Sequence, residues 1–329
     1  MRLRITHETR YDYVPAVETA QHMVYLTPLN RPFQQLLNSQ ISVSPEPAVI
    51  SSALDVYGNT RHFFAQNVPH AQLVVSASSE VNTQASAVPE SHIAWEATCA
   101  HFQYKAGQAF DAGSVFSFDS PMVPRHLEFA DYARVSFTPN AGLLQASLDL
   151  MGRIYTEFTY ESNSTEVNTP ALQALVQRKG VCQDFAHIFI ACLRSLGLSA
   201  RYVSGYLLTS PPPGMVKLRG SDASHAWVAV YVPDFPEGGS WVDLDPTNNK
   251  AGWYSPGEDY VTLAIGRDFS DVSPVRGVIH GGANHVLHVG VTVEPVGNHN
   301  EPTTPLQGGG QNQSQSQSQS QSQSQRPQG

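Results

Sequence analysis

Residues 178–198 read RKGVCQDFAHIFIACLRSLGL, and this stretch decides the fold of the chain. Apolar side chains recur at helical spacing from Cys182 to Leu196, and most of the residues between them are apolar as well. A helix that is apolar nearly all round lies in the interior of a protein. Gly197 suits the left-handed position that follows a helix end. We therefore expect a buried central helix that begins at or next to Cys182 and ends at Gly197.

Cys182 falls in the first turn of this helix. There the unpaired backbone N–H groups and the positive end of the helix dipole favour a thiolate over a thiol. Arg178 and Lys179 add positive charge nearby. A single buried cysteine is nevertheless more often a small hydrophobic side chain than a nucleophile. The rest of the chain must therefore decide between the two interpretations.

Composition narrows the classes of protein. The chain has 329 residues, 41% of them hydrophobic, which is ordinary for a globular protein of two or three domains. A formal charge of -9 argues against a nucleic-acid partner. No stretch has the apolar run of a signal peptide or a membrane span, and the three cysteines, Cys99, Cys182 and Cys192, provide no disulfide framework. We expect a cytoplasmic location and no membrane partner.

The chain divides by pattern into an α+β protein. Residues 1–88 contain short runs of period two separated by turn signals, which predict an N-terminal antiparallel β-sandwich without chemistry of its own. Residues 89–296 are expected to form the catalytic core, with a helical lead-in to about residue 157 and a sheet closed by strands up to residue 293. Residues 297–329 are rich in Gln and Ser and are expected to be a disordered tail.

Two polar side chains on a predicted hairpin complete a constellation with Cys182. His225 begins the run HAWVAVYV, and Asp245 ends the run SWVDLD. If Val232 pairs with Ser240, then His225 and Asp245 are diagonal neighbours on the same face, within side-chain reach. A cysteine becomes a strong nucleophile when an imidazole holds its proton, and a carboxylate on the other ring nitrogen orients that imidazole.

Three separated motifs then resemble a known family. GVCQDFAHIFIACLRSLGLSARYVSGYL, DASHAWVAVYVP and WVDLDPTNN resemble, in this order, the core of bacterial transglutaminase-like proteins in the Cys-His-Asp superfamily. The strand-rich first segment is similar to the β-sandwich that precedes this core in many bacterial members. The resemblance implies a papain-like core with a central helix packed on an antiparallel sheet.

The resemblance also implies roles for individual residues. Cys182 matches the nucleophile, His225 the general base and acid, and Asp245 the residue that orients the histidine. Five further positions match the surroundings of the site, two aromatic and three polar: Trp227, Trp241, Asp184, Gln183 and Asn248. The side chain of Gln183 can point away, so the backbone N–H of Cys182 is the expected oxyanion donor.

The implied reaction is acyl transfer from a peptide or protein amide through a thioester, completed by water or by an amine acceptor. No cofactor is expected, and no metal, because His280, His285 and His288 match no zinc spacing. Two alternatives stay open: a small-molecule acyltransferase with the same triad, and a non-catalytic binding module on a degenerate transglutaminase fold. The sequence leaves the oligomeric state open.

Overall fold

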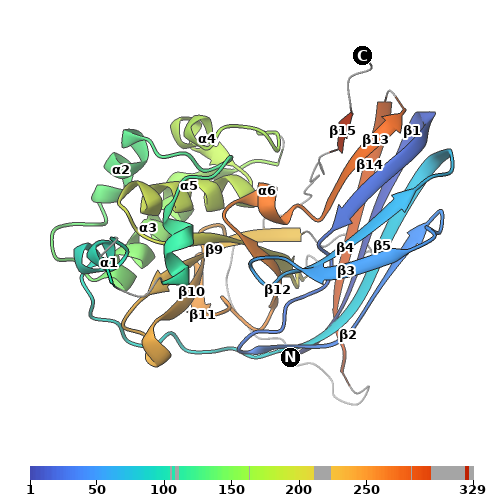
Figure 1. Cartoon of the computed structure of the whole chain (residues 1–329). Coiled ribbons are helices and arrows are strands. Elements are labelled where there is room, and N and C mark those ends of the chain that lie inside the picture. The colour runs from blue at the N-terminus through green and yellow to red at the C-terminus, as the bar shows by residue number, and fades with distance from the viewer. Residues whose placement is uncertain are drawn as a thin grey trace.

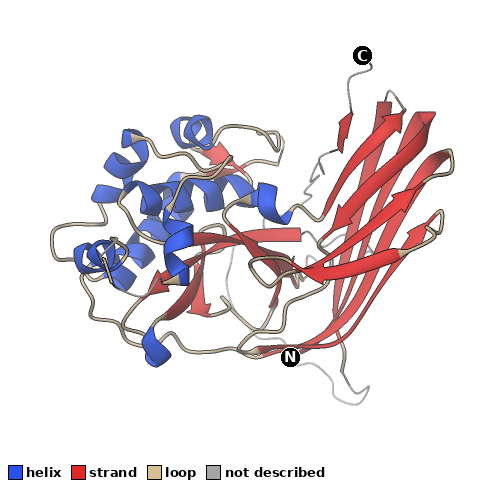
Figure 2. Cartoon of the chain, viewed as in Figure 1, coloured by secondary structure: helices blue, strands red, loops and turns tan. Residues whose placement is uncertain are grey.

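The structure of the chain is a computed structural model. It describes residues 1–103, 106–107, 111–162, 164–210, 224–282, 284–297 and 323–325. A strand-rich part and a helix-rich part lie side by side, as Figures 1 and 2 show. In the described residues, no helix is both long and apolar enough to cross a membrane.

The strand-rich part is one large, curled sheet of eight strands, antiparallel except for the pairing of β13 with β15. Its strands are β1 (Arg2–Val24), β2 (Gln34–Ser44), β3 (Ile50–Leu54), β4 (Thr60–Gln66), β5 (His70–Thr83), β13 (Val275–Gly281), β14 (Asn284–Pro295) and β15 (Gln323–Gln325). The first half of β1 pairs with β5 and β14, and its second half pairs with β4 and β13. The curl follows from this change of partners, and Pro15, which has no N–H to donate, lies at the point of change.

This arrangement corrects the predicted division of the chain. Residues 1–88 do form strands of the first part, but residues 275–295 belong to the same sheet instead of closing the sheet of the core. The core assigned to residues 89–296 therefore ends before β13. The predicted disordered tail lies outside the described residues, apart from residue 297 and residues 323–325, which form β15 beside β13.

The helix-rich part contains the predicted helical lead-in and the central helix. Its helices are α1 (Trp95–His101), η1 (Ala112–Ser117), α2 (Leu127–Arg134), α3 (Leu143–Glu157), α4 (Ala171–Gln177), α5 (Cys182–Ser195), η2 (Pro236–Gly238) and α6 (Phe269–Val272). Its five-stranded antiparallel sheet has the order β11-β10-β9-β8-β12. These strands are β8 (Ala200–Leu207), β9 (Ser224–Val232), β10 (Ser240–Asp245), β11 (Lys250–Trp253) and β12 (Tyr260–Gly266), and β6 (Thr159–Tyr160) pairs separately with β7 (Lys179–Gly180).

The central helix α5 is buried on all sides, as its sequence predicts. Every residue from Cys182 to Arg194 is buried, and the helix packs between α2, α3 and α4 and one face of the sheet. Gly197 has φ of 87°, the left-handed conformation that ends the helix. Arg194 is fully buried because backbone carbonyls surround its guanidinium, among them those of Phe116 and Ala200 at 2.8–3.2 Å.

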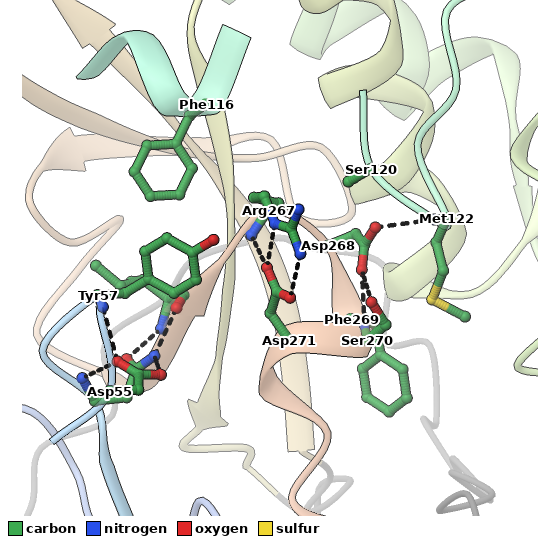
Figure 3. Close-up of polar contacts among 12 residues, drawn as sticks. Asp55, Tyr57, Phe116, Ser120, Met122, Arg267, Asp268, Phe269, Ser270 and Asp271 are labelled. Atoms are coloured by element: carbon green, nitrogen blue, oxygen red, sulfur yellow. Dashed lines mark hydrogen bonds and ion pairs between the residues drawn. The ribbon is translucent and has the colours of Figure 1, made fainter. Parts of the chain in front are cut away.

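The two parts share a hydrophobic core and a docked turn. Tyr206 and Val261 of the helix-rich part are buried within the core of the strand-rich part. The turn between β3 and β4 packs against the helix-rich part, as Figure 3 shows. There Asp55 accepts a hydrogen bond of 2.8 Å from the backbone N–H of Tyr57, and the ring of Tyr57 lies 5.3 Å from that of Phe116.

The short helix α6 is anchored beside this turn (Figure 3). Asp268 accepts hydrogen bonds from the backbone N–H groups of Ser270 and Met122, at 2.8 and 2.9 Å. Arg267 and Asp271 form an ion pair of 2.9 Å. These contacts fix the end of β12, which is the strand of the core sheet nearest to the strand-rich part.

Candidate active site

A buried histidine–carboxylate pair lies at the end of the β9–β10 hairpin. Ser240 pairs with Val232, so the predicted register is confirmed. The Nε2 atom of His225 lies 2.7 Å from Oδ2 of Asp245, and neither side chain is exposed. The hairpin thus brings together two residues that are twenty positions apart in the chain.

Three further groups hold the carboxylate of Asp245. The hydroxyl of Tyr260 donates to Oδ2 at 2.7 Å, and the side-chain amide of Asn248 donates to the same oxygen at 2.8 Å. The backbone N–H of Thr247 donates to Oδ1 at 2.8 Å. The carboxylate therefore has partners on both oxygens, which fixes its orientation towards His225.

The electrostatics of this pair favour the ionised forms of both residues. Burial raises the pKa of Asp245, but the charge of His225 and the hydrogen bonds to His225, Asn248 and Tyr260 outweigh it and lower this pKa. Burial likewise lowers the pKa of His225, but the charge and hydrogen bond of Asp245, together with the neighbouring Cys182, raise it to about 10. The site therefore favours an imidazolium at neutral pH.

The thiol of Cys182 interacts with the imidazole of His225. Cys182 begins α5 and is fully buried. Because Nε2 of His225 is bonded to Asp245, the buried Nδ1 atom is the ring nitrogen left for the thiol. A polar contact with Cys182 and the charge of Cys182 both raise the pKa of His225.

Asp184 and Gln183 support the start of the helix. Oδ2 of Asp184 accepts from the backbone N–H of Val181 at 2.8 Å and from the hydroxyl of Thr165 at 2.6 Å, so Asp184 caps the turn that carries Cys182. Burial raises the pKa of Asp184, and these two hydrogen bonds oppose the increase. The side-chain amide of Gln183 donates to the carbonyl of Val167 at 3.0 Å, and therefore points away from the thiol.

The two tryptophans predicted near the site have different surroundings. The ring of Trp227 lies 6.0 Å from that of His225 and 5.4 Å, edge to face, from that of Tyr260. Trp241 instead packs against the guanidinium of Arg201, 3.9 Å from the ring centre. Trp227 is thus in the wall of the site, whereas Trp241 is further along the same face of the sheet.

Sequence reasoning missed Tyr260 and Asp243. Tyr260 begins β12, and no local pattern links it to a carboxylate fifteen residues earlier. Asp243 accepts a hydrogen bond of 2.8 Å from the indole N–H of Trp227. The period-two alternation of SWVDLD does place Asp243 on the same face as Asp245, and this signal could have identified it.

The described part of the chain contains no group of three or more His, Cys, Asp or Glu side chains that could hold a metal ion. His280 and His288 lie on β13 and β14, where each is paired with an acidic side chain of β1, Glu18 and Asp12 respectively.

A buried helix that begins at a cysteine and packs on an antiparallel sheet with a histidine–aspartate pair defines a papain-like, transglutaminase-like core. Comparison with known families agrees. Residues 3–82 match the bacterial transglutaminase-like N-terminal region, and residues 135–246 match the transglutaminase-like superfamily. The chain therefore belongs to the transglutaminase-like superfamily.

Relatives and solved structures share nearly the whole length of the chain. An uncharacterized protein of Mycobacterium tuberculosis is 38% identical over 306 residues, which cover 89% of this chain and 93% of the relative. An uncharacterized protein of Mycobacterium leprae is 28% identical over 281 residues, which cover 85% of this chain and 94% of the relative. The crystal structure of a candidate cysteine protease from Cytophaga hutchinsonii has the same fold, with a TM-score of 0.66 and 21% identity. The match covers 91% of this chain and 92% of that protein.

Proposed function

We propose that the protein is an acyl-transfer enzyme that cleaves or exchanges peptide or protein amides with Cys182 as the nucleophile. The observation that carries this proposal is the buried His225–Asp245 pair at 2.7 Å, with Cys182 acting on the remaining side of the imidazole. Membership of the transglutaminase-like superfamily and the shared fold with a candidate cysteine protease support the same conclusion.

The first half of the reaction forms a thioester. The imidazolium that the site favours holds the thiol proton on Nδ1 of His225, and the sulfur of Cys182, freed of that proton, attacks the amide carbonyl carbon. The resulting oxyanion is expected to meet the backbone N–H of Cys182 at the positive end of α5. When the C–N bond breaks, Nδ1–H of His225 gives its proton to the leaving amine.

The second half releases the acyl group. Water or an incoming amine attacks the thioester carbonyl and loses a proton to Nδ1 of His225, and the sulfur of Cys182 leaves while the proton stays on the imidazolium. Asp245 remains ionised throughout and stabilises the imidazolium. All three side chains are buried, so the residues that cover the thiol must move aside to admit a substrate.

The test is incubation of the pure protein with a peptide library, with and without a primary amine, followed by mass spectrometry. Cleavage, deamidation and amine incorporation differ in mass and are read in one experiment. We expect Cys182→Ala to abolish all of them and Asp245→Asn to reduce the rate by a factor on the order of 10³–10⁴.

Cys192→Ala is the matched control, because Cys192 is a buried cysteine on the same helix and makes no part of the site. Unchanged turnover in Cys182→Ala would disprove the proposed nucleophile. Acyl transfer only from a small thioester donor would instead support the small-molecule acyltransferase.

A further inference from the structure

We propose that Arg31, from the segment between β1 and β2 of the strand-rich part, and Gln34, the first residue of β2, are positioning residues of the active site. They act through two aromatic side chains, Trp227 and Tyr260, that hold the His225–Asp245 pair. The proposal rests on the function proposed above and gives the strand-rich part a role within it.

The outer edge of β12 explains why the strand-rich part contacts this strand. β12 is the last strand of its sheet, so its outward backbone groups would be left without partners when covered. A bulge between Thr262 and Ala264 shifts the pairing of β12 with β8. Because of this bulge, the outward-facing residues are three positions apart, at Thr262 and Ile265.

Two amide side chains of the strand-rich part satisfy these two positions in the same way. Gln34 donates to the carbonyl of Thr262 at 2.8 Å and accepts from its N–H at 2.7 Å. Asn59 donates to the carbonyl of Ile265 at 2.7 Å and accepts from its N–H at 2.8 Å. Each amide therefore replaces one residue of a missing neighbouring strand, and both are buried.

We call each of these two pairs of amide–backbone hydrogen bonds a clamp. Only the clamp that Gln34 forms with Thr262 lies next to the His225–Asp245 pair. Thr262 is two residues after Tyr260 on β12, and Tyr260 donates to Asp245 at 2.7 Å. Arg31 strengthens this clamp, because its Nη1 donates to Oγ1 of Thr262 at 2.8 Å. A shift of β12 at Thr262 would move the hydroxyl of Tyr260 away from the carboxylate.

A second branch runs from Arg31 to the imidazole. Nη2 of Arg31 pairs with Oδ1 of Asp243 at 3.2 Å, and this ion pair is buried. The other oxygen of Asp243 accepts from the indole N–H of Trp227 at 2.8 Å, and the ring of Trp227 lies beside that of His225. One guanidinium thus joins the two aromatic supports of the catalytic pair.

Arg31 acts on Asp243 mainly by fixing the position of its carboxylate, and less by balancing its charge. Arg201 is a second buried guanidinium that interacts electrostatically with Asp243. Burial and the charge of Arg31 lower the pKa of Arg201 to about 9, and Asp243 opposes this. Arg201 therefore still balances the charge of Asp243 when Arg31 is removed, while the hydrogen bonds of Arg31 are lost.

The experiment compares Gln34→Ala and Arg31→Met with Asn59→Ala. Asn59 is a matched control because it makes the same two backbone hydrogen bonds to β12 but lies away from the site. The measurements are kcat and KM on a peptide found in the library screen, the rate of iodoacetamide labelling of Cys182, and the melting temperature. We expect similar melting temperatures for Gln34→Ala and Asn59→Ala.

We expect Gln34→Ala and Arg31→Met to lower kcat and the labelling rate by ~10-fold or more, with KM nearly unchanged, because a small misplacement of the catalytic groups is costly. Asn59→Ala should leave both rates at the wild-type level. Arg31→Lys keeps part of the contacts and should recover part of the rate; it is used alone if the larger changes prevent folding.

Equal losses in Asn59→Ala and Gln34→Ala would show a merely structural role and overturn the proposal, as would unchanged rates in the Arg31 and Gln34 variants. The labelling rate needs no substrate. If the wild type turns over no amide, the proposed function fails, while the labelling comparison still decides whether Arg31 and Gln34 position His225.

Discussion

The helix α5 carries two buried cysteines, ten residues apart, in opposite chemical settings. Cys182 is the first residue of the helix and lies beside His225, whereas Cys192 lies near the other end, surrounded by apolar side chains. Burial raises the pKa of the Cys192 thiol far above its ordinary value. Both side chains are equally inaccessible, so burial alone does not separate them. The neighbours at the helix start make the difference.

Two buried histidines beside this helix show the same contrast. His225, near the helix start, has a carboxylate partner, and its pKa is raised to about 10. His187 lies within the helix, where burial lowers its pKa to about 4. Its Nε2 accepts a hydrogen bond of 3.2 Å from the backbone N–H of Phe269, which requires the neutral ring. The carboxylate of Asp245 thus stabilises a positive charge beside the start of α5, whereas the apolar surroundings of His187 exclude one.

The largest expected effect is on stability as a function of pH. The raised pKa of His225 means that the folded state binds this proton more tightly than the unfolded state does. Its stabilisation is therefore complete below the unfolded pKa of about 6.5 and is lost as the pH rises through about 10. We expect this loss to be on the order of 5 kcal/mol, and His225→Gln to remove it.

His187 should show the reverse dependence. Its lowered pKa means that the unfolded state binds the proton more tightly, so stability falls as the pH drops from about 6.5 towards 4. His7 and His22 have similarly lowered pKa values and add to the same acid slope, so His187→Gln should remove only part of it. Urea unfolding between pH 4 and pH 10 measures how the free energy of unfolding falls on the acid side and on the alkaline side. If His225→Gln left the fall on the alkaline side unchanged, the proposed ion pair would be contradicted.

The next effect is on thiol reactivity. Exposure predicts that Cys99 reacts first, because it is only partly buried. However, burial and the charge of Glu96 raise the pKa of Cys99 to about 11. We expect iodoacetamide at pH 7 to label Cys182 on the order of 100-fold faster than Cys99 or Cys192, because the imidazole of His225 holds its proton.

Peptide mapping by mass spectrometry measures the three rates together. His225→Ala should reduce the labelling of Cys182 to that of the other two cysteines. If the cysteines were labelled in the order of their exposure, with Cys99 first, the different surroundings of Cys182 and Cys192 would have no effect on thiol reactivity.

The sequence predicted the parts of the site that depend on neighbouring residues. The start and end of α5 follow from apolar periodicity and Gly197, and the register of His225 and Asp245 follows from alternation in a short hairpin. These patterns are local, so the sequence contains them directly. The resemblance to a family added Asn248, which contacts both His225 and Asp245.

The parts that the sequence did not predict depend on distant partners. Strands β13 and β14 alternate like any other strand, and nothing in them indicates that they pair with β1, more than 250 residues earlier. Arg31 lies before β2 and Gln34 is its first residue, no pattern in the sequence singles them out, and their partners on β12 are more than 220 residues away. Such pairings are set by packing of the whole molecule and leave no local signal.

The smallest expected effect concerns the turn that distinguishes Cys182 from Cys192. Asp184 caps this turn through the backbone N–H of Val181, and loss of such a cap costs about 1 kcal/mol. Asp184→Ala should lower the free energy of unfolding by about this amount and slow the labelling of Cys182 only a few-fold, since His225 remains in place. Urea unfolding and peptide mapping provide both values.

The variant Gly180→Ala tests the same cap through the residue that faces the carboxylate of Asp184. A Cβ at Gly180 would lie 2.7 Å from the carboxylate of Asp184, too close for an undistorted contact. Gly180→Ala should therefore displace the carboxylate and destabilise the fold at least as much as Asp184→Ala does. The double variant should cost less than the sum of the two, because both changes remove one contact. Additive costs would show that Gly180 serves another purpose and that the cap does not depend on it.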